Sequence, residues 1–440
     1  MTDIQITSPV SAPRIGESAP RPDGVPKVTG TFTFSSDLWH NNMLWGGTLR
    51  SPHPSANIKS IDISGALAIN GVSAVLTHTD VPGSLLYGLE HADQPVLAAD
   101  VVRYEGESVA IVAADHPETV RRALAAIVVD YQVTAPLVDP EAAEQAEPIH
   151  PDGNLIRRLR LRHGDQNIQG EIQVEGTYEV GMQDQAFLGP ESGLALPSED
   201  GGVELFVSTQ WLHSDRDQVA VCLGLPPEKV RFTLSGVGGA FGAREDLSLH
   251  AHLCLLALHT GRPVKMVYSR EESFHGHVHR HPARMWYRHH ADTDGNLLRV
   301  EARLILDGGA YASSSGAVIS NATCFAAGPY LIPSADIDGA VVRTNNPPCG
   351  AMRGFGAVQT CVGHEAQMDK LAAALGMDPV ELRLKNALKS GDKLLTGQTI
   401  TGAAPVAEVI KSCVDHPSTL IPSDDMMSLP GGAGRTADPH

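Results

Sequence analysis

The sequence is poor in positive charge and in long apolar runs. Its 440 residues hold 33 Lys and Arg against 51 Asp and Glu, which gives a formal net charge of −18. So acidic a chain lacks the basic surface that attracts nucleic-acid phosphates, and we expect no nucleic-acid partner. Its apolar runs, such as LCLLAL at 253–258, are far shorter than the ~20 residues that span a bilayer. We therefore expect no membrane partner either.

The chain also lacks a secretory signal and closely spaced cysteines. Its first residues, MTDIQITSPVSAPRIGES, have neither a basic start nor an apolar stretch, so we expect a cytoplasmic protein. The six cysteines show no Cys-x-x-Cys spacing, which argues against an encoded iron–sulfur cluster or structural zinc site. We expect buried, reduced thiols at Cys222, Cys254, Cys324, Cys349, Cys361 and Cys413.

What the sequence does contain is typical of a globular protein with many turns. Apolar residues make up 42% and charged residues 19%, with 43 Gly and 30 Pro. At roughly 150 residues per domain the length corresponds to about three domains. So many glycines and prolines argue against a helical bundle or a coiled coil.

Composition divides the chain into five parts. Residues 1–22 are polar and Pro-rich and are expected to form a flexible arm, whereas 23–139 mix short strands and helices as in a compact α+β domain. Residues 140–172, rich in Asp, Glu, Pro and Gly, predict a long surface connection. A second body of alternating strands and helices is expected at 173–405, and a disordered tail at 406–440.

Several helices carry clear end signals. One is predicted to follow two β-rich runs in 101–114, with Asp115 or His116 as its N-cap. Three more are predicted to end at Gly224, at Gly261 and, for a helix over 357–375, at Gly376. A capping box at 378–381 predicts a last helix through 388, and VRFTLSG at 230–236 predicts a strand.

Two Gly-rich loops are the most informative stretches for function. SGVGGAFGARED at 235–246 lies between a predicted strand and a predicted helix, and TNNPPCGAMRGFGAVQ at 344–359 also precedes a helix. Glycines let a backbone approach a ligand closely, and the spacing matches neither a Walker loop nor a dinucleotide fingerprint. The first loop alone could be a plain turn, Arg353 a surface charge and Phe355 a core residue. Two such loops in one body favour a shared pocket.

Four alternating histidines suggest a metal site at first sight. His275, His277, His279 and His281 would lie on one face of a strand, an arrangement that could suit a divalent ion. No carboxylate or cysteine completes a ligand set in this run, and Pro282 interrupts it. We therefore expect a solvated or interface strand and no metal held directly by side chains.

Taken together, the motifs resemble those of the xanthine dehydrogenase and aldehyde oxidase family, in its molybdenum-binding large chain. The similarity runs from residue 18 to about 405 and includes GMQDQAFLGPESGLALP, STQWL, GVGGAFGARED, GRPVKMVYSREESF, RHP, DGGAYAS, TNNPPCGAMRGFGAVQ and LGMDPVELRLKNAL. Within the family the motifs look most like the molybdenum subunit of actinobacterial xanthine dehydrogenases. The resemblance implies an α+β fold in which an α/β hammerhead domain, 23–139, precedes the first molybdopterin-binding domain, 173–405.

The resemblance also implies roles for particular residues. Gln210 corresponds to a glutamine that hydrogen-bonds an oxo ligand of the molybdenum, Glu245 to a carboxylate that orients a purine, and Phe355 to the ring stacked on it. The cofactor-binding positions are Gln210, Gly239, Ala240, Phe241, Gly242 and Arg353. An amide donor, a carboxylate acceptor and a phenyl face suit these roles chemically.

Two departures from the family pattern shape the functional expectation. Asn321 stands near the place where animal-type purine oxidisers carry a substrate arginine. No Gly-x-Gly-Glu motif with the family's general-base glutamate occurs near the end, so we expect no catalytic base in this chain. We expect the N-terminal half of a catalytic subunit, without the second molybdopterin domain and inactive until a C-terminal fragment completes it.

The expected activity is that of a xanthine dehydrogenase, which hydroxylates hypoxanthine and xanthine to urate in purine catabolism. The alternatives are an aldehyde or N-heterocycle hydroxylase of the same family, and an inactive truncation product that only docks to partner subunits. The resemblance implies molybdenum-molybdopterin as cofactor, with 2Fe-2S clusters and FAD on partner subunits and a heteroaromatic substrate.

Overall fold

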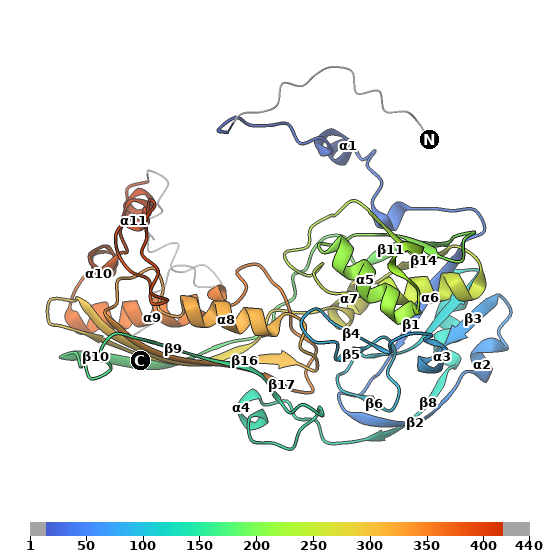
Figure 1. Ribbon diagram of the computed structural model, residues 1–440, viewed down its shortest axis with the longest axis horizontal. Coiled ribbons are helices and arrows are strands. Elements are labelled where there is room, and N and C mark those ends of the chain that lie inside the picture. The colour runs from blue at the N-terminus through green and yellow to red at the C-terminus, as the bar shows by residue number, and fades with distance from the viewer. Residues whose placement is uncertain (1–14, 417–440) are drawn as a thin grey trace, which may run out of the picture.

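Two β-sheets at opposite ends of an elongated molecule organise the fold (Figure 1). The computed structural model describes residues 15–416. Strands and helices are mixed along the chain in both parts, so the predicted α+β class is confirmed. Among the described residues no helix is both long and apolar enough to cross a membrane.

The larger sheet has seven strands and joins segments that we expected to lie in separate bodies. In spatial order its strands are β13 (Val230–Leu234), β12 (Val203–Val207), β11 (Ser192–Pro197), β14 (Val264–Val267), β1 (Leu44–Arg50), β7 (Ser108–Ala114) and β3 (Val72–Leu76). The junction is the parallel pair β1 and β14, in which Leu44 lies opposite Val264. The first domain and the first part of the second therefore share one sheet.

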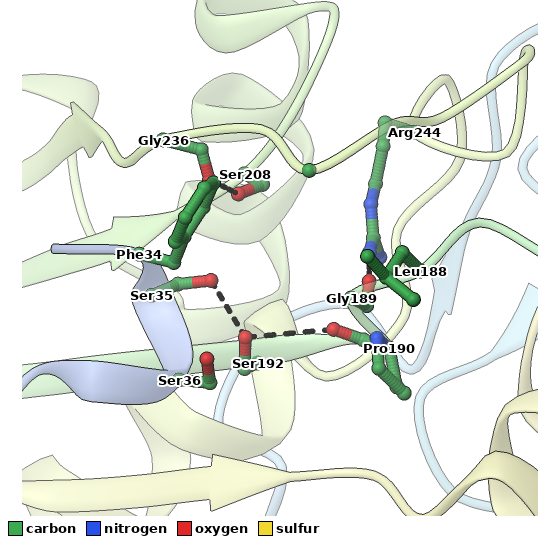
Figure 2. Close-up of a pocket in the computed structure, with 11 residues that line it drawn as sticks. Phe34, Ser35, Ser36, Leu188, Gly189, Pro190, Ser192, Ser208, Gly236 and Arg244 are labelled. Carbon is green, nitrogen blue, oxygen red and sulfur yellow. Dashed lines mark hydrogen bonds between the residues drawn. The ribbon is translucent and has the colours of Figure 1, made fainter. Parts of the chain in front are cut away.

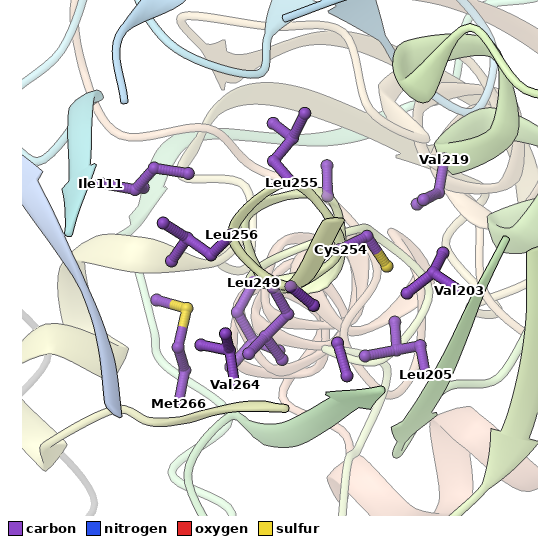
Figure 3. Packing of buried hydrophobic residues seen from close by; sticks show 14 of the residues in the cluster. Ile111, Val203, Leu205, Val219, Leu249, Cys254, Leu255, Leu256, Val264 and Met266 are labelled. Carbon is purple, nitrogen blue, oxygen red and sulfur yellow. The ribbon is translucent and has the colours of Figure 1, made fainter. Parts of the chain in front are cut away.

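Helix α6 (His250–Thr260) forms the centre of the core beside this sheet. Every residue from His250 to Ala257 is buried, as expected for a helix that is apolar all round. Figure 3 shows its side chains surrounded by apolar groups of neighbouring strands and of α5 (Leu212–Leu223). α6 ends at Gly261 and α5 at Gly224, both in the left-handed conformation, which confirms the two predicted ends.

The second sheet has five strands and carries two helices on one face (Figure 1). Its strands are, in spatial order, β10 (Ile172–Val180), β15 (Ala283–Ala291), β16 (Leu297–Gly309), β17 (Ser334–Arg343) and β9 (Leu155–His163). The helices are α8 (Ser315–Phe325) and α9 (Ala357–Leu375). α9 has the predicted bounds and ends at Gly376.

Strand β9 corrects the expectation of a surface connection over 140–172. Its sequence LIRRLRLRH alternates apolar and basic residues, so that one face packs against the core while the other meets solvent. On the solvent face, Arg158 pairs with Asp338 at 3.0 Å and Arg160 with Asp336 at 2.8 Å, both on the adjacent strand β17. The high charge of this segment concealed a strand.

The remaining elements are shorter. They are α1 (Gly24–Thr29), α2 (Ser64–Leu67), α3 (Pro117–Ala126), α4 (Pro140–Ala143), α7 (Arg270–Gly276), α10 (Pro379–Asn386), α11 (Val406–Val414), the three-stranded sheet of β6 (Val101–Val102), β2 (Ala56–Asp62) and β8 (Val128–Val133), the pair β4 (Leu86–Tyr87) and β5 (Gln94–Pro95), and the 3-10 helices η1 (Ser35–Asp37), η2 (His78–Asp80) and η3 (Pro227–Lys229). His116 caps α3 and Asp378 caps α10, as predicted.

Two further expectations need correction. Residues 406–414 form the helix α11 where we expected disorder, since the apolar positions of VAEVIKSCV recur at helical spacing. The rest of the expected tail beyond 416, and positions 1–14 of the expected arm, lie outside the described residues. The prediction of buried thiols is confirmed for Cys222, Cys254 and Cys349. It is wrong for Cys324, Cys361 and Cys413, which are exposed.

Candidate functional site

The two Gly-rich loops meet, and their meeting point defines the candidate site. The first loop links β13 to α6 and the second links β17 to α9. The backbone N–H of Arg353 donates to the carbonyl of Phe241 over 2.8 Å. At the same contact Gly242 lies so close to the second loop that a Cβ there would be 2.5 Å from the Ala351 carbonyl oxygen. Only glycine permits this approach.

A cavity of about 460 Å³ opens where the loops meet. Its size is within the range of small-molecule sites, which is roughly 300–1,000 Å³. The lining residues are Gln210, Trp211, Phe241, Gly242, Glu245, Ala351, Met352, Arg353, Gly354 and Phe355. Six of the eight residues singled out from the sequence are among them, whereas Gly239 and Ala240 lie in the same loop but not in this lining.

Gln210 and Glu245 form a hydrogen-bonded pair at the wall of the cavity. Gln210 follows β12, and its backbone N–H donates to the carbonyl of Arg244 over 2.8 Å. Its side-chain Nε2 donates to Glu245 Oε1 over 2.9 Å. Burial raises the pKa of Glu245, and the side chains of Gln210 and Trp211 oppose that rise. The site thus holds a carboxyl group whose charge is partly desolvated.

Both phenylalanines of the site adopt backbone conformations that are rare for a residue with a side chain. Phe241 has φ +53° and Phe355 has φ +48°. Such conformations cost roughly 1–3 kcal/mol each and cluster at functional sites. Phe241 as a residue is 49% exposed, so it is not held there by core packing. The two strained aromatic positions therefore support the assignment of the cavity as a binding site.

Asn321 stabilises the second loop and does not line the cavity. It lies on α8, and its side-chain Nδ2 donates to the backbone carbonyl of Phe355 over 2.7 Å. In this structure Asn321 therefore holds the loop that carries Phe355.

Phe355 belongs partly to the cavity and partly to the core. Its side chain is half-buried, lines the cavity and packs against the apolar cluster beneath α8 and α9. The two interpretations left open by the sequence, a pocket wall and a core residue, both hold for this one ring.

This dual position leads to a prediction for Phe355→Leu, which keeps the packing volume but removes the aromatic face. We expect the melting temperature to stay close to that of the wild type, while binding of a flat substrate loses roughly 0.5–1.5 kcal/mol, the value of an aromatic contact. Kinetics and thermal unfolding of the same variant measure both effects, with Phe274→Leu on α7 as a matched control. A loss of stability clearly above the ~1.5 kcal/mol typical of hydrophobic swaps of similar size, with unchanged kinetics, would assign the ring to the core alone.

Trp211 and Met352 line the cavity and were not predicted. Trp211 directly follows Gln210 and is 47% exposed. A tryptophan next to a predicted cofactor residue was the available signal, since large exposed aromatic rings are common in binding sites. Met352 carried no such signal, because its position follows only from the contact between the loops.

A second, smaller cavity of about 190 Å³ lies against the first loop, bounded by the N-terminal segment (Figure 2). Several of its polar groups are paired: Ser35 with Ser192 at 2.6 Å, Ser208 with the carbonyl of Gly236 at 2.9 Å, and Arg244 with the carbonyl of Gly189 at 2.8 Å. Because these groups are engaged within the protein and the space is small, the cavity between the two loops is the better candidate.

The histidine run is not the strand that we expected. His275 lies in the last turn of α7. His281 is buried, with its Nε2 2.8 Å from Ser315 Oγ. His277 and His279 are buried against Asp184, so the argument that no carboxylate is at hand is wrong. The carboxylate comes from a distant part of the sequence, where a local pattern could not reveal it.

Comparisons with known proteins agree with this architecture. The chain matches the family model of the molybdopterin cofactor-binding domain over residues 149–387 and that of the aldehyde oxidase and xanthine dehydrogenase a/b hammerhead domain over 29–135. The first match begins before β9, in keeping with the place of that strand in the second sheet. The order of the two domains is the one implied by the sequence motifs.

The chain covers a different share of the length of each relative. It is 41% identical over 402 residues to the nicotinate dehydrogenase large molybdopterin subunit of Eubacterium barkeri, covering 90% of this chain and 95% of that protein. It is 38% identical to a probable xanthine dehydrogenase subunit of Bacillus subtilis, covering 96% of this chain but 57% of the relative. The crystallised aldehyde oxidoreductase from Desulfovibrio gigas superposes with a TM-score of 0.86 at 30% identity, over 90% of this chain and 46% of that one. The chain thus spans about half of these two longer relatives.

Proposed function

The chain belongs to the aldehyde oxidase and xanthine dehydrogenase family of molybdenum hydroxylases, and we propose that it forms the cofactor-facing and substrate-facing half of a subunit that hydroxylates a flat N-heterocycle. The observation that carries this proposal is the Gln210–Glu245 pair beside three aromatic rings in a single cavity. Xanthine is the first candidate substrate, following the sequence motifs. Nicotinate is the second, because a 41% identical relative is named for it.

The residues around the cavity fit a molybdopterin cofactor. The cofactor is anionic, and Arg353 offers an exposed guanidinium at the cavity wall while the glycines of both loops let backbone N–H groups approach it. The exposed Gln210 amide can donate a hydrogen bond to an oxygen on the metal. When bound, the cofactor supplies oxygen-atom transfer to carbon and the uptake of two electrons, which side chains cannot provide.

The protein's own contribution is to hold and orient the ring. A carboxylate at Glu245 accepts a hydrogen bond from a ring N–H, and its hydrogen bond from Gln210 fixes its direction. Phe355, Phe241 and Trp211 supply aromatic surfaces for a flat substrate. The three rings and the carboxylate together favour a heteroaromatic substrate over a small aliphatic aldehyde, which offers no ring N–H and no π-face.

We further propose that a second chain supplies the rest of the cofactor site. A subunit of nearly this extent exists in the Eubacterium relative, of which this chain covers 95%. The longer relatives hold roughly another half of their length outside the matched part. Iron–sulfur and FAD subunits would then carry electrons away from the cofactor, as the family resemblance implies.

Glu245→Gln tests the proposed substrate contact in the assembled enzyme. The substitution keeps the shape and removes the charge, so we expect kcat/KM for the accepted heterocycle to fall about 10- to 100-fold, which corresponds to the ~1–3 kcal/mol of a badly matched buried polar group. Molybdenum content should not change. Xanthine, nicotinate and an aromatic aldehyde are assayed side by side.

The matched control is Glu271→Gln, which removes a carboxylate on the exposed side of α7. Unaltered kcat/KM for every substrate in Glu245→Gln would reject the assigned role. If only the aldehyde is turned over, the substrate class is that of an aldehyde and not of an N-heterocycle. If an assembly loaded with molybdenum turns over no substrate, the chain has a docking role without catalysis.

A further inference from the structure

Three side chains outside the proposed active site converge on one point. Asp184 lies shortly after β10, whereas His277 and His279 follow α7 directly. Asp184 Oδ2 lies 3.1 Å from His277 Nε2 and 3.4 Å from His279 Nε2. The two imidazole rings are stacked, with centroids 5.1 Å apart and an interplanar angle of 21°. One potential ligand atom from each of the three residues lies within 4.8 Å of the others.

Hydrogen bonding within the protein accounts for only part of this cluster, through the contact of His277 Nε2 with Gln185 Oε1 at 3.1 Å. Asp184 Oδ2, the atom that faces both Nε2 nitrogens, is buried, and no hydrogen bond of suitable geometry reaches it. The side chains of the two histidines are only 2% and 6% exposed. A buried carboxylate oxygen without a donor calls for an explanation, such as an ion.

We propose that Asp184, His277 and His279 form a binding site for a divalent transition-metal ion, zinc in the first place, separate from the molybdenum. At the usual zinc–ligand distances of ~2.0–2.1 Å, tetrahedral ligands lie ~3.3–3.4 Å from one another. The separations of 3.1 and 3.4 Å between the carboxylate oxygen and the two nitrogens match that spacing. Two imidazoles with one carboxylate suit zinc, cobalt or iron, whereas magnesium and calcium prefer oxygen ligands.

The surroundings of His277 also fit a metal ligand. Its second nitrogen, Nδ1, lies 3.4 Å from Glu191 Oε1, and Glu191 in turn lies 3.2 Å from Arg244. Histidines that bind a metal commonly direct their other ring nitrogen at a carboxylate, which fixes the tautomer and the ring orientation. Glu191 is 1% exposed, so this second contact is built into the core.

The site would connect the two loops of the active cavity from behind. Gln185, next to Asp184, donates from its Nε2 to the carbonyl of Ala351 in the second loop over 2.8 Å, and its Oε1 lies 3.1 Å from His277 Nε2, where an ion would take the place of the proton between them. On the other side, Glu191 holds Arg244 of the first loop. An ion at the cluster would therefore stiffen the support of both loops. Asp184, at 12% exposed, is the most accessible of the three and marks the entry side.

The test is metal binding by the full chain, which does not require loaded molybdenum. The chain is stripped with a chelator and titrated with Zn²⁺ or Co²⁺, and the metal retained after dialysis is measured by mass spectrometry. We expect one equivalent, a visible spectrum typical of tetrahedral Co²⁺, and a higher melting temperature with metal. His277→Gln, His279→Gln and Asp184→Asn should each weaken binding at least ~100-fold, and Glu191→Gln about 10- to 100-fold, the usual effect of losing a group that orients a ligand.

His259→Gln, at an exposed position in the last turn of α6, is the control and should bind metal as the wild type does. If a variant fails to fold, the wild type decides the question, because the proton spectrum of its cobalt form should show two paramagnetically shifted imidazole rings. The proposal would be overturned if the wild type retained no more metal than the His277→Gln, His279→Gln double variant, or if its cobalt form showed fewer than two shifted imidazoles. The cluster would then be a plain histidine–carboxylate contact.

Discussion

A chain of these 440 residues, produced alone in a host that makes molybdopterin, is expected to lose the cofactor on purification. We expect the chain alone to bind the cofactor at least ~100-fold more weakly than the assembled enzyme does, which is a difference of about 2.7 kcal/mol in binding free energy. Gln210, Phe241 and Arg353 line the cavity and are all exposed to solvent. Ligand sites normally bury roughly 70–90% of the ligand surface. A cofactor held at this cavity would be contacted from one side only.

The loss of cofactor is measured by comparing two samples: the chain alone, and the chain co-expressed with a second chain that supplies the part found only in the longer relatives. Molybdenum per folded chain is determined by mass spectrometry after gel filtration. Co-expression with an iron–sulfur subunit alone is the control, and it should not restore molybdenum. Near-stoichiometric molybdenum in the chain alone would contradict the proposal that a second chain completes the site.

Features set by neighbouring residues could be predicted from the sequence. The helix ends at Gly224, Gly261 and Gly376 are correct because each glycine adopts φ between +62° and +63°, a conformation that favours glycine and ends a helix. The caps at His116 and Asp378 are correct for a similar reason, since a side chain bonds to the backbone two residues on. None of these depends on where the rest of the chain lies.

Features set by distant pairing could not be predicted in this way. The parallel contact of Leu44 with Val264 joins two parts of the chain that composition separates, and nothing in either segment specifies the other. The same holds for Asp184, which meets histidines far along the sequence. The cavity residues were found because the family motifs assigned them, whereas Trp211, outside those assignments, emerged only when the loops were seen together.

Gly242→Ala is expected to disturb the candidate site strongly, because it changes the point where the two loops touch. Gly242 has φ +109°, which residues with a side chain rarely adopt, and an added Cβ would lie 2.5 Å from the carbonyl oxygen and 2.7 Å from the carbonyl carbon of Ala351. Backbone strain of this kind costs roughly 1–3 kcal/mol, and the clash adds to it because its partner is backbone that cannot rotate away. We expect the two loops to separate, with loss of the hydrogen bond from Arg353 to the carbonyl of Phe241.

Gly376→Ala is the matched control for that effect. Gly376 also has positive φ, at +63°, but nothing lies within 4 Å of an added Cβ, so the substitution introduces backbone strain without a clash. It should cost about 1 kcal/mol, as at other left-handed helix ends, and leave the cavity unchanged. Thermal unfolding of both variants, and molybdenum content in the assembled enzyme, separate the two cases. If Gly242→Ala lowered stability no more than Gly376→Ala and kept its molybdenum, the loops would not approach one another this closely in solution, and the cavity between them would lose its structural basis.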